Sequence, residues 1–69
     1  MVDRELKRRL RALGFVLLRQ GGRHAFWGYP DGSRTTSISR HRGEIPPGTL
    51  SKILRDLGIP RDDFEGRSP

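Results

Sequence analysis

The chain has 69 residues, with 14 Lys and Arg against 8 Asp and Glu, and a formal net charge of +6. A single domain of this length buries too small a core for a deep substrate cavity, and the lack of cysteine excludes disulfides and thiolate metal sites. His24 and His41 are the only imidazoles, so we expect no metal ion. No apolar run approaches the roughly 20 residues that span a membrane, so we expect a cytoplasmic protein without a membrane partner or a cofactor.

The first predicted element is an amphipathic helix over residues 3–13. Its apolar positions recur at i, i+4 and i+7, which is the spacing of one helical face: Leu6, Leu10 and Leu13. The rest of its surface is basic: Arg4, Lys7, Arg8, Arg9 and Arg11. We expect Asp3 to cap the N-terminus and Gly14 to end the helix. Three explanations of the basic surface stay open: a solvated face, a track for RNA, and a surface covered by an acidic protein.

Three short strands are predicted next, joined by tight turns as an antiparallel meander. Residues 15–20 form a largely buried strand, because they are rich in residues that favour β structure. Residues 24–29 and 34–39 form the second and third strands. The glycine pair at 21–22 and the Pro-Asp-Gly-Ser segment at 30–33 supply the turns between them.

A second helix follows a loop over residues 41–48 that is rich in proline and glycine. We expect Thr49 to cap this helix and Gly58 to end it. Its apolar positions again have helical spacing: Leu50, Ile53, Leu54 and Leu57. The charged tail over residues 61–69 is expected to fray unless Phe64 attaches one turn of it to the body.

This order of elements predicts an α+β domain, α-β-β-β-α, in which two helices cover one face of a three-stranded antiparallel sheet and leave the other open. We expect one domain over residues 1–69, with an ordered core over about 3–59 and a tail over 60–69. The second strand has two faces: His24, Phe26 and Gly28 on one, and Ala25, Trp27 and Tyr29 on the other. The alternation does not decide which of these faces the helices cover.

Positive charge is concentrated in residues 1–43, which carry a net +7, whereas residues 44–69 carry −1. A phosphate backbone is the commonest partner of such a surface. The twelve arginines, against two lysines, suit planar contacts with phosphate. A solvated surface is the alternative explanation of the same charge.

A set of short motifs in a fixed order is similar to the HicA toxin family, also called YcfA-like proteins. The motifs are Leu13-Gly14-Phe15, Gly21-Gly22-Arg23-His24, Pro30-Asp31-Gly32, His41-Arg42-Gly43-Glu44-Ile45, Pro47-Gly48-Thr49-Leu50, Ile53-Leu54 and Leu57-Gly58-Ile59. The resemblance runs from about Glu5 to Ile59. It implies a fold similar to double-stranded-RNA-binding domains and a toxin of a type II toxin–antitoxin system, which cleaves mRNA and is silenced by a HicB-like antitoxin.

The resemblance implies that His24 is the catalytic residue, since it matches the histidine of a Gly-Ser-x-His turn. The chain departs from that pattern at Gly22, where serine is common, and at Arg23, where another polar residue or a second histidine is often found. His41 matches a second histidine position of the family, whose role is less defined. Histidine side chains can move protons at neutral pH, as metal-free RNA cleavage requires.

The remaining predicted site residues bind RNA. We expect Arg23, with Arg40 or Arg42, to hold the scissile phosphate. Trp27 or Tyr29 would stack on a base. Structural explanations stand beside these roles: His24 bonded to a turn carbonyl, His41 orienting its loop, and the two aromatic side chains filling the sheet or contacting a partner.

Two other classes of function stay open. One is an RNA-binding module of the same fold without catalysis, which would bind structured RNA in a salt-sensitive way. The other is a basic protein that binds DNA or the ribosome. A helix-turn-helix does not fit, because the predicted sheet separates the two helices.

Overall fold

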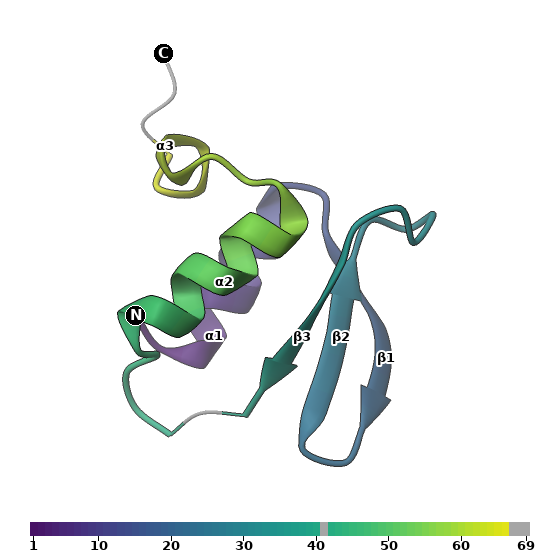
Figure 1. Cartoon of the computed structure of the whole chain (residues 1–69), viewed down its shortest axis with the longest axis horizontal. Coiled ribbons are helices and arrows are strands. Elements are labelled where there is room, and N and C mark those ends of the chain that lie inside the picture. Colours follow the sequence, from purple (N-terminus) through teal and green to yellow (C-terminus); the bar gives the residue numbers. More distant parts are fainter. Residues whose placement is uncertain (41, 67–69) are drawn as a thin grey trace.

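The computed structural model describes residues 1–40 and 42–66. Its elements, in chain order, are α1 (Asp3–Ala12), β1 (Val16–Gly21), β2 (His24–Gly28), β3 (Thr35–Ser39), α2 (Pro47–Leu57) and α3 (Arg61–Phe64). The strands form one antiparallel sheet in the order β1-β2-β3. Figure 1 shows α1 and α2 on the same side of this sheet. The predicted α+β architecture is therefore confirmed, with α3 as a short addition. None of the described helices is long and apolar enough to cross a membrane.

The N-terminus of α1 differs from the prediction. Val2, not Asp3, holds the N-cap position, and it makes no side-chain cap. The reason is that Val2 forms an antiparallel bridge with Glu44, whose carboxylate also pairs with the N-terminal amino group. The extended backbone of that bridge ends at Val2, so Asp3 is already helical and pairs instead with Lys7, at 2.8 Å.

Both long helices end at a glycine, as predicted. Gly14 has a φ of +96° and Gly58 a φ of +70°, which are left-handed conformations that side chains with a Cβ resist. After Gly14, the amide of Phe15 donates to the carbonyl of Leu10 at 3.0 Å, which satisfies one of the open carbonyls of the last turn.

The start of α2 also differs from the prediction, because it lies two residues before Thr49. Pro46 is the N-cap residue and Pro47 the first helical residue. Proline suits that position, since its fixed φ is already helical and its missing N–H would have had no partner there. Thr49 therefore lies inside the first turn and caps nothing.

The strand register decides which face of the sheet is the core. Ala25 lies opposite Ile38, and Trp27 lies opposite Thr36, and all four side chains are buried. The other side of the sheet carries no helix in Figure 1. The buried apolar side chains form one cluster: Leu6, Leu10, Phe15, Ala25, Trp27, Ile38, Ile45, Ile53, Leu54, Leu57, Ile59 and Phe64.

The prediction of a largely buried first strand is wrong. All six residues of β1 are exposed, including Leu17 and Leu18. β1 is the edge strand that lies away from α2, because α2 packs against β3 at the other edge of the sheet. The register also shifts between Leu17 and Arg19, and such a bulge bends a strand away from regular pairing.

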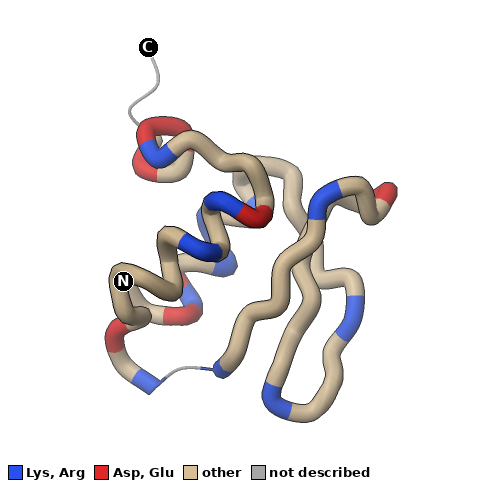
Figure 2. Tube along the Cα trace, in the orientation of Figure 1, with Lys and Arg blue, Asp and Glu red and all other residues tan. Residues whose placement is uncertain are grey.

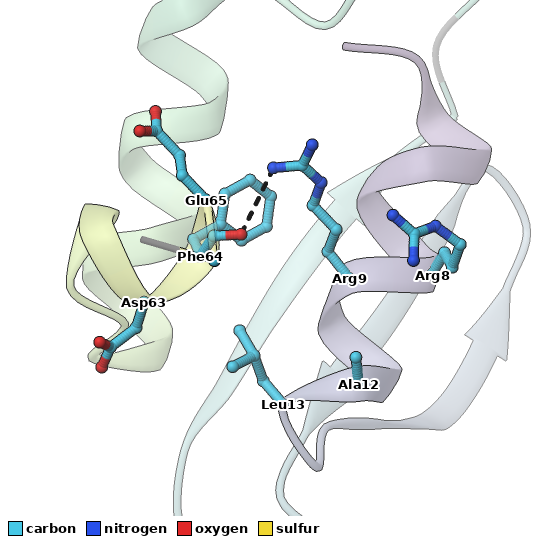
Figure 3. A pocket seen from close by; sticks show the side chains of 8 residues that line it. Arg8, Arg9, Ala12, Leu13, Asp63, Phe64 and Glu65 are labelled. Atoms are coloured by element: carbon cyan, nitrogen blue, oxygen red, sulfur yellow. Dashed lines mark hydrogen bonds between the residues drawn. The ribbon is translucent and has the colours of Figure 1, made fainter. Parts of the chain in front are cut away.

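The short helix α3 is attached to α1 through Phe64, whose side chain is only 3% exposed. Arg9 of α1 donates from Nη1 to the Phe64 carbonyl at 3.4 Å, and its guanidinium lies 5.4 Å from the ring centroid (Figure 3). In the same view, the carboxylates of Asp63 and Glu65 point away from Arg9. The predicted anchoring of the tail by Phe64 is therefore confirmed.

Candidate functional site

A pocket of about 360 Å³ lies at the end of the sheet where the β1–β2 turn meets the end of β3. It is lined by Arg23, His24, Ser39, Arg40 and Arg42. Four of these five residues are predicted site residues, and they come from two segments of the chain, around residues 23–24 and around residues 40–42. The tertiary structure therefore brings together the histidine and the arginines that sequence analysis selected.

The β1–β2 turn positions the histidine. Gly21 pairs with His24, so Gly22 and Arg23 form a two-residue turn. Gly22 has a φ of +51°, in the left-handed region that favours glycine. This conformation accounts for the glycine at position 22. The turn leaves His24 as the first residue of β2, on a regular and therefore rigid element.

Main-chain pairing attaches the other wall of the pocket. His24 lies opposite Ser39, the last residue of β3, on the same face of the sheet. One residue later, the amide of Arg40 donates to the carbonyl of Arg23 at 3.2 Å. The backbone thus holds the two arginines beside the histidine.

The pocket carries positive charge that is not paired with a carboxylate of the described residues. Within residues 1–40 and 42–66, Arg23, Arg40 and Arg42 form no ion pair. Figure 2 shows blue segments at the β1–β2 turn, at the end of β3 and on the loop that follows, whereas the helices carry both colours. An anion that enters this pocket would meet cations from two sides, which is the condition for phosphate binding.

The basic surface of α1 is different, because its own carboxylates neutralise much of it. Asp3 pairs with Lys7, and Glu5 pairs with both Arg8 and Arg9. The hydrogen bonds from Arg8 and then Arg9 lower the pKa of the Glu5 carboxyl from 4.5 to about 2. Of the two basic regions, the pocket around His24 is therefore the better anion site.

His24 itself is exposed. Among the residues that the structure describes, no hydrogen bond to its imidazole is found, so the alternative in which it bonds a turn carbonyl has no support there. A solvent-facing imidazole between arginines can exchange a proton with a bound ligand. His41, the second histidine of the family motif, lies outside the described residues.

The two aromatic residues predicted to stack on a base do not belong to this pocket. Trp27 is only 1% exposed, and the guanidinium of Arg11 lies 5.1 Å from its ring centroid. Tyr29 follows the opposite end of β2 and stacks on Phe15, with ring centroids 4.4 Å apart. The prediction is therefore wrong for Trp27, which is core, whereas Tyr29 is 38% exposed at the other end of β2 and its stacking on a base stays a prediction.

Three residues of the same region were not selected from the sequence. Ser39 lines the pocket, and Phe26 shares the open sheet face with His24, opposite Arg19. The guanidinium of Arg19 lies 4.7 Å from the centroid of the Phe26 ring. Alternation along β2 placed His24 and Phe26 together, but only the pairing with β3 shows that their face is the open one.

No metal site is evident in the described part of the chain, which contains no group of three or more His, Cys, Asp or Glu able to hold an ion. A second pocket, of about 320 Å³, lies between α1 and α3 (Figure 3). Its arginines, Arg8 and Arg9, are already paired with Glu5, and acidic side chains line its other wall. The chemistry of this pocket does not suit a polyanion.

Comparison with known proteins gives one family. No protein of curated function matches the sequence. The model of the family described as the HicA toxin of bacterial toxin-antitoxin systems matches residues 4–59, which is most of the chain. The match spans both walls of the His24 pocket and both long helices. The chain therefore belongs to the HicA toxin family of bacterial toxin–antitoxin systems.

Proposed function

We propose that this protein is an endoribonuclease that cleaves mRNA without a metal ion, with His24 as a general acid or base. The family is known for ribonucleases that pair with HicB antitoxins, and we expect a HicB-like partner here. The observation that carries the proposal is the pocket in which His24 lies among Arg23, Arg40 and Arg42.

The reaction we propose is attack of the ribose 2′-oxygen on the adjacent phosphorus. The 2′-OH loses its proton, the P–O5′ bond breaks, and the departing 5′-oxygen gains a proton. The products are a 2′,3′-cyclic phosphate and a 5′-hydroxyl. His24 accepts the first proton or donates the second, and solvent water completes the other transfer. Charge increases on the phosphate oxygens in the transition state, and the arginine side chains stabilise it.

The first test is cleavage of a long unstructured RNA in EDTA by the wild type and by His24→Ala. General acid–base catalysis contributes about 100-fold or more, so we expect a loss of that size. Because His24 is exposed, its replacement should change stability by less than about 0.5 kcal/mol. Circular dichroism and urea unfolding check that both proteins are folded. Equal cleavage by a folded His24→Ala protein would refute the assignment.

A second pair of variants tests the phosphate contacts. Arg40→Ala removes a cation from the pocket, whereas Arg34→Ala removes one at the other end of β3. We expect weaker RNA binding and a reduced salt dependence in Arg40→Ala, with little change in Arg34→Ala. RNA binding by the wild type without cleavage would instead identify an RNA-binding module.

A further inference from the structure

The open face of the sheet presents an aromatic side chain next to the candidate catalytic histidine. Phe26 follows His24 by two residues on β2, so the two side chains lie on the same face about 7 Å apart along the strand. The Phe26 side chain is half-buried, although no helix covers this face. A partly exposed ring beside a catalytic pocket is a surface on which a ligand can pack.

The neighbours of Phe26 leave space for a flat ligand. On the β1 side, the Arg19 guanidinium lies over the ring, 4.7 Å from its centroid. On the β3 side, the residue opposite Phe26 is Ser37, which is small and exposed. Further along the same face are Gly28 and Thr35, and the Leu18 side chain lies beside Gly28, where a Cβ would come within 3.0 Å of Leu18 Cδ1. Arg19 therefore covers the ring from the β1 side, whereas the residue opposite the ring on the β3 side is too small to cover it.

The charge around this face identifies the class of ligand. Arg19 lies on one side of Phe26, and the arginines of the His24 pocket lie beyond the histidine. An aromatic platform beside a line of cations is the arrangement that binds single-stranded nucleic acid, because bases stack on rings while phosphates contact cations.

We infer that Phe26 and Arg19 form a binding site for one unpaired base of the RNA strand, next to the nucleotide whose phosphate lies at His24. The inference rests on the proposed ribonuclease function for the identity of the strand. The base stacks on Phe26 from the Ser37 side, and Arg19 supports the ring from behind and contacts the backbone. Such stacking is tolerant of sequence, since every base has a π face.

The test measures RNA binding in the His24→Ala background, where cleavage does not interfere. The probe is a fluorescently labelled, unstructured 12-nucleotide RNA. The control probe is the same oligonucleotide with abasic sites in place of bases. Phe26→Leu removes the ring but keeps an apolar side chain, so the fold is preserved. Stacking contributes about 1–3 kcal/mol per base, which corresponds to a loss of about 5-fold to 100-fold in affinity for the intact RNA.

Three comparisons make the result specific to stacking. Phe26→Leu should bind the abasic RNA as the unmodified protein does, and Phe26→Trp should restore binding to the intact RNA. Leu17→Ala is the matched control, because Leu17 is also exposed and apolar but pairs with Trp27 on the opposite face. It should leave RNA binding unchanged.

The failure of this inference differs from the failure of the proposed function. If the wild type cleaves RNA, and a folded Phe26→Leu protein binds and cleaves it equally well, the base site is refuted and the face is left for a protein partner. If the wild type does not cleave but binding depends on the Phe26 ring, the base site holds and the nuclease proposal fails. Equal losses on intact and abasic RNA would also refute the base site.

Discussion

Gly28 allows the backbone of β2 to approach the segment before β3 more closely than a side chain would permit. A Cβ at this position would overlap the carbonyl oxygen of Arg34, and it would lie 3.1 Å from the carbonyl carbon and 3.0 Å from Leu18 Cδ1. The obstacle is backbone, so it cannot rotate away as the end of a flexible side chain can. Gly28→Ala must therefore displace the turn that leads into β3.

The cost of that displacement has two parts. Forced overpacking costs about 1–3 kcal/mol. The amide of Tyr29 donates to the same Arg34 carbonyl at 3.1 Å, and losing this hydrogen bond adds about 1 kcal/mol. We expect Gly28→Ala to lower the free energy of unfolding by about 2–4 kcal/mol. A domain of 69 residues has only about 3–10 kcal/mol in total, so the loss should lower Tm by about 10 °C or more.

The assay is urea unfolding followed by circular dichroism, with Gly48→Ala as the matched control. Gly48 lies in α2, has no positive φ, and has open space where a Cβ would be. The same substitution there should stabilise the protein by up to about 1 kcal/mol, because alanine restricts the unfolded chain more than glycine does. If Gly28→Ala unfolds at the wild-type urea concentration, the close approach between β2 and Arg34 is refuted.

Two further predictions concern polar contacts of the fold. The buried Thr36 hydroxyl donates to Asp56 Oδ2 at 3.0 Å and joins β3 to α2, so Thr36→Val should cost about 1–2 kcal/mol in urea unfolding. The exposed neighbour Thr35→Val should change stability by less than about 0.5 kcal/mol, and equal effects would contradict the contact. Hydrogen bonds from Arg8 and Arg9 lower the pKa of the Glu5 carboxyl to about 2. The contribution of this carboxylate to the free energy of unfolding is therefore present above about pH 4.5 and is lost as the pH falls toward 2. Glu5→Gln should therefore lose less stability than the wild type when the pH is lowered through this range. If the free energy of unfolding depends on pH in the same way in both proteins, this role of Glu5 is refuted.

Local signals predicted the elements and the turn that carries His24. Gly14 and Gly58 end their helices because a left-handed residue is needed there, which is a property of the chain within a few residues. The position of His24 after the Gly22-Arg23 turn is local in the same sense. The helix starts were less predictable, because Val2 is held by Glu44, more than forty residues away in the chain.

Strand pairing decides which residues come together at the candidate site. Arg23 and Arg40 are far apart in the sequence, and they meet because β2 and β3 pair with His24 opposite Ser39. The chemistry of phosphate binding suggested these arginines, and Arg23 adjoins His24 in the chain, but nothing in the spacing alone places Arg40 beside the histidine. The error over Trp27 has the same origin, since its exposure depends on which sheet face the helices cover.

The sequence by itself determined the order of the two long helices and the three strands, the ends of both long helices, the excess of arginine and the family. Each of these depends on neighbours in the chain or on composition. Only the tertiary structure decided that Trp27 is buried while His24 and Phe26 face solvent, that β1 is exposed, and that three arginines meet at one pocket. Those properties depend on the register of the paired strands and on which face of the sheet the helices cover. Alternation within one strand cannot decide between the two faces, because its pattern is the same whichever face is covered.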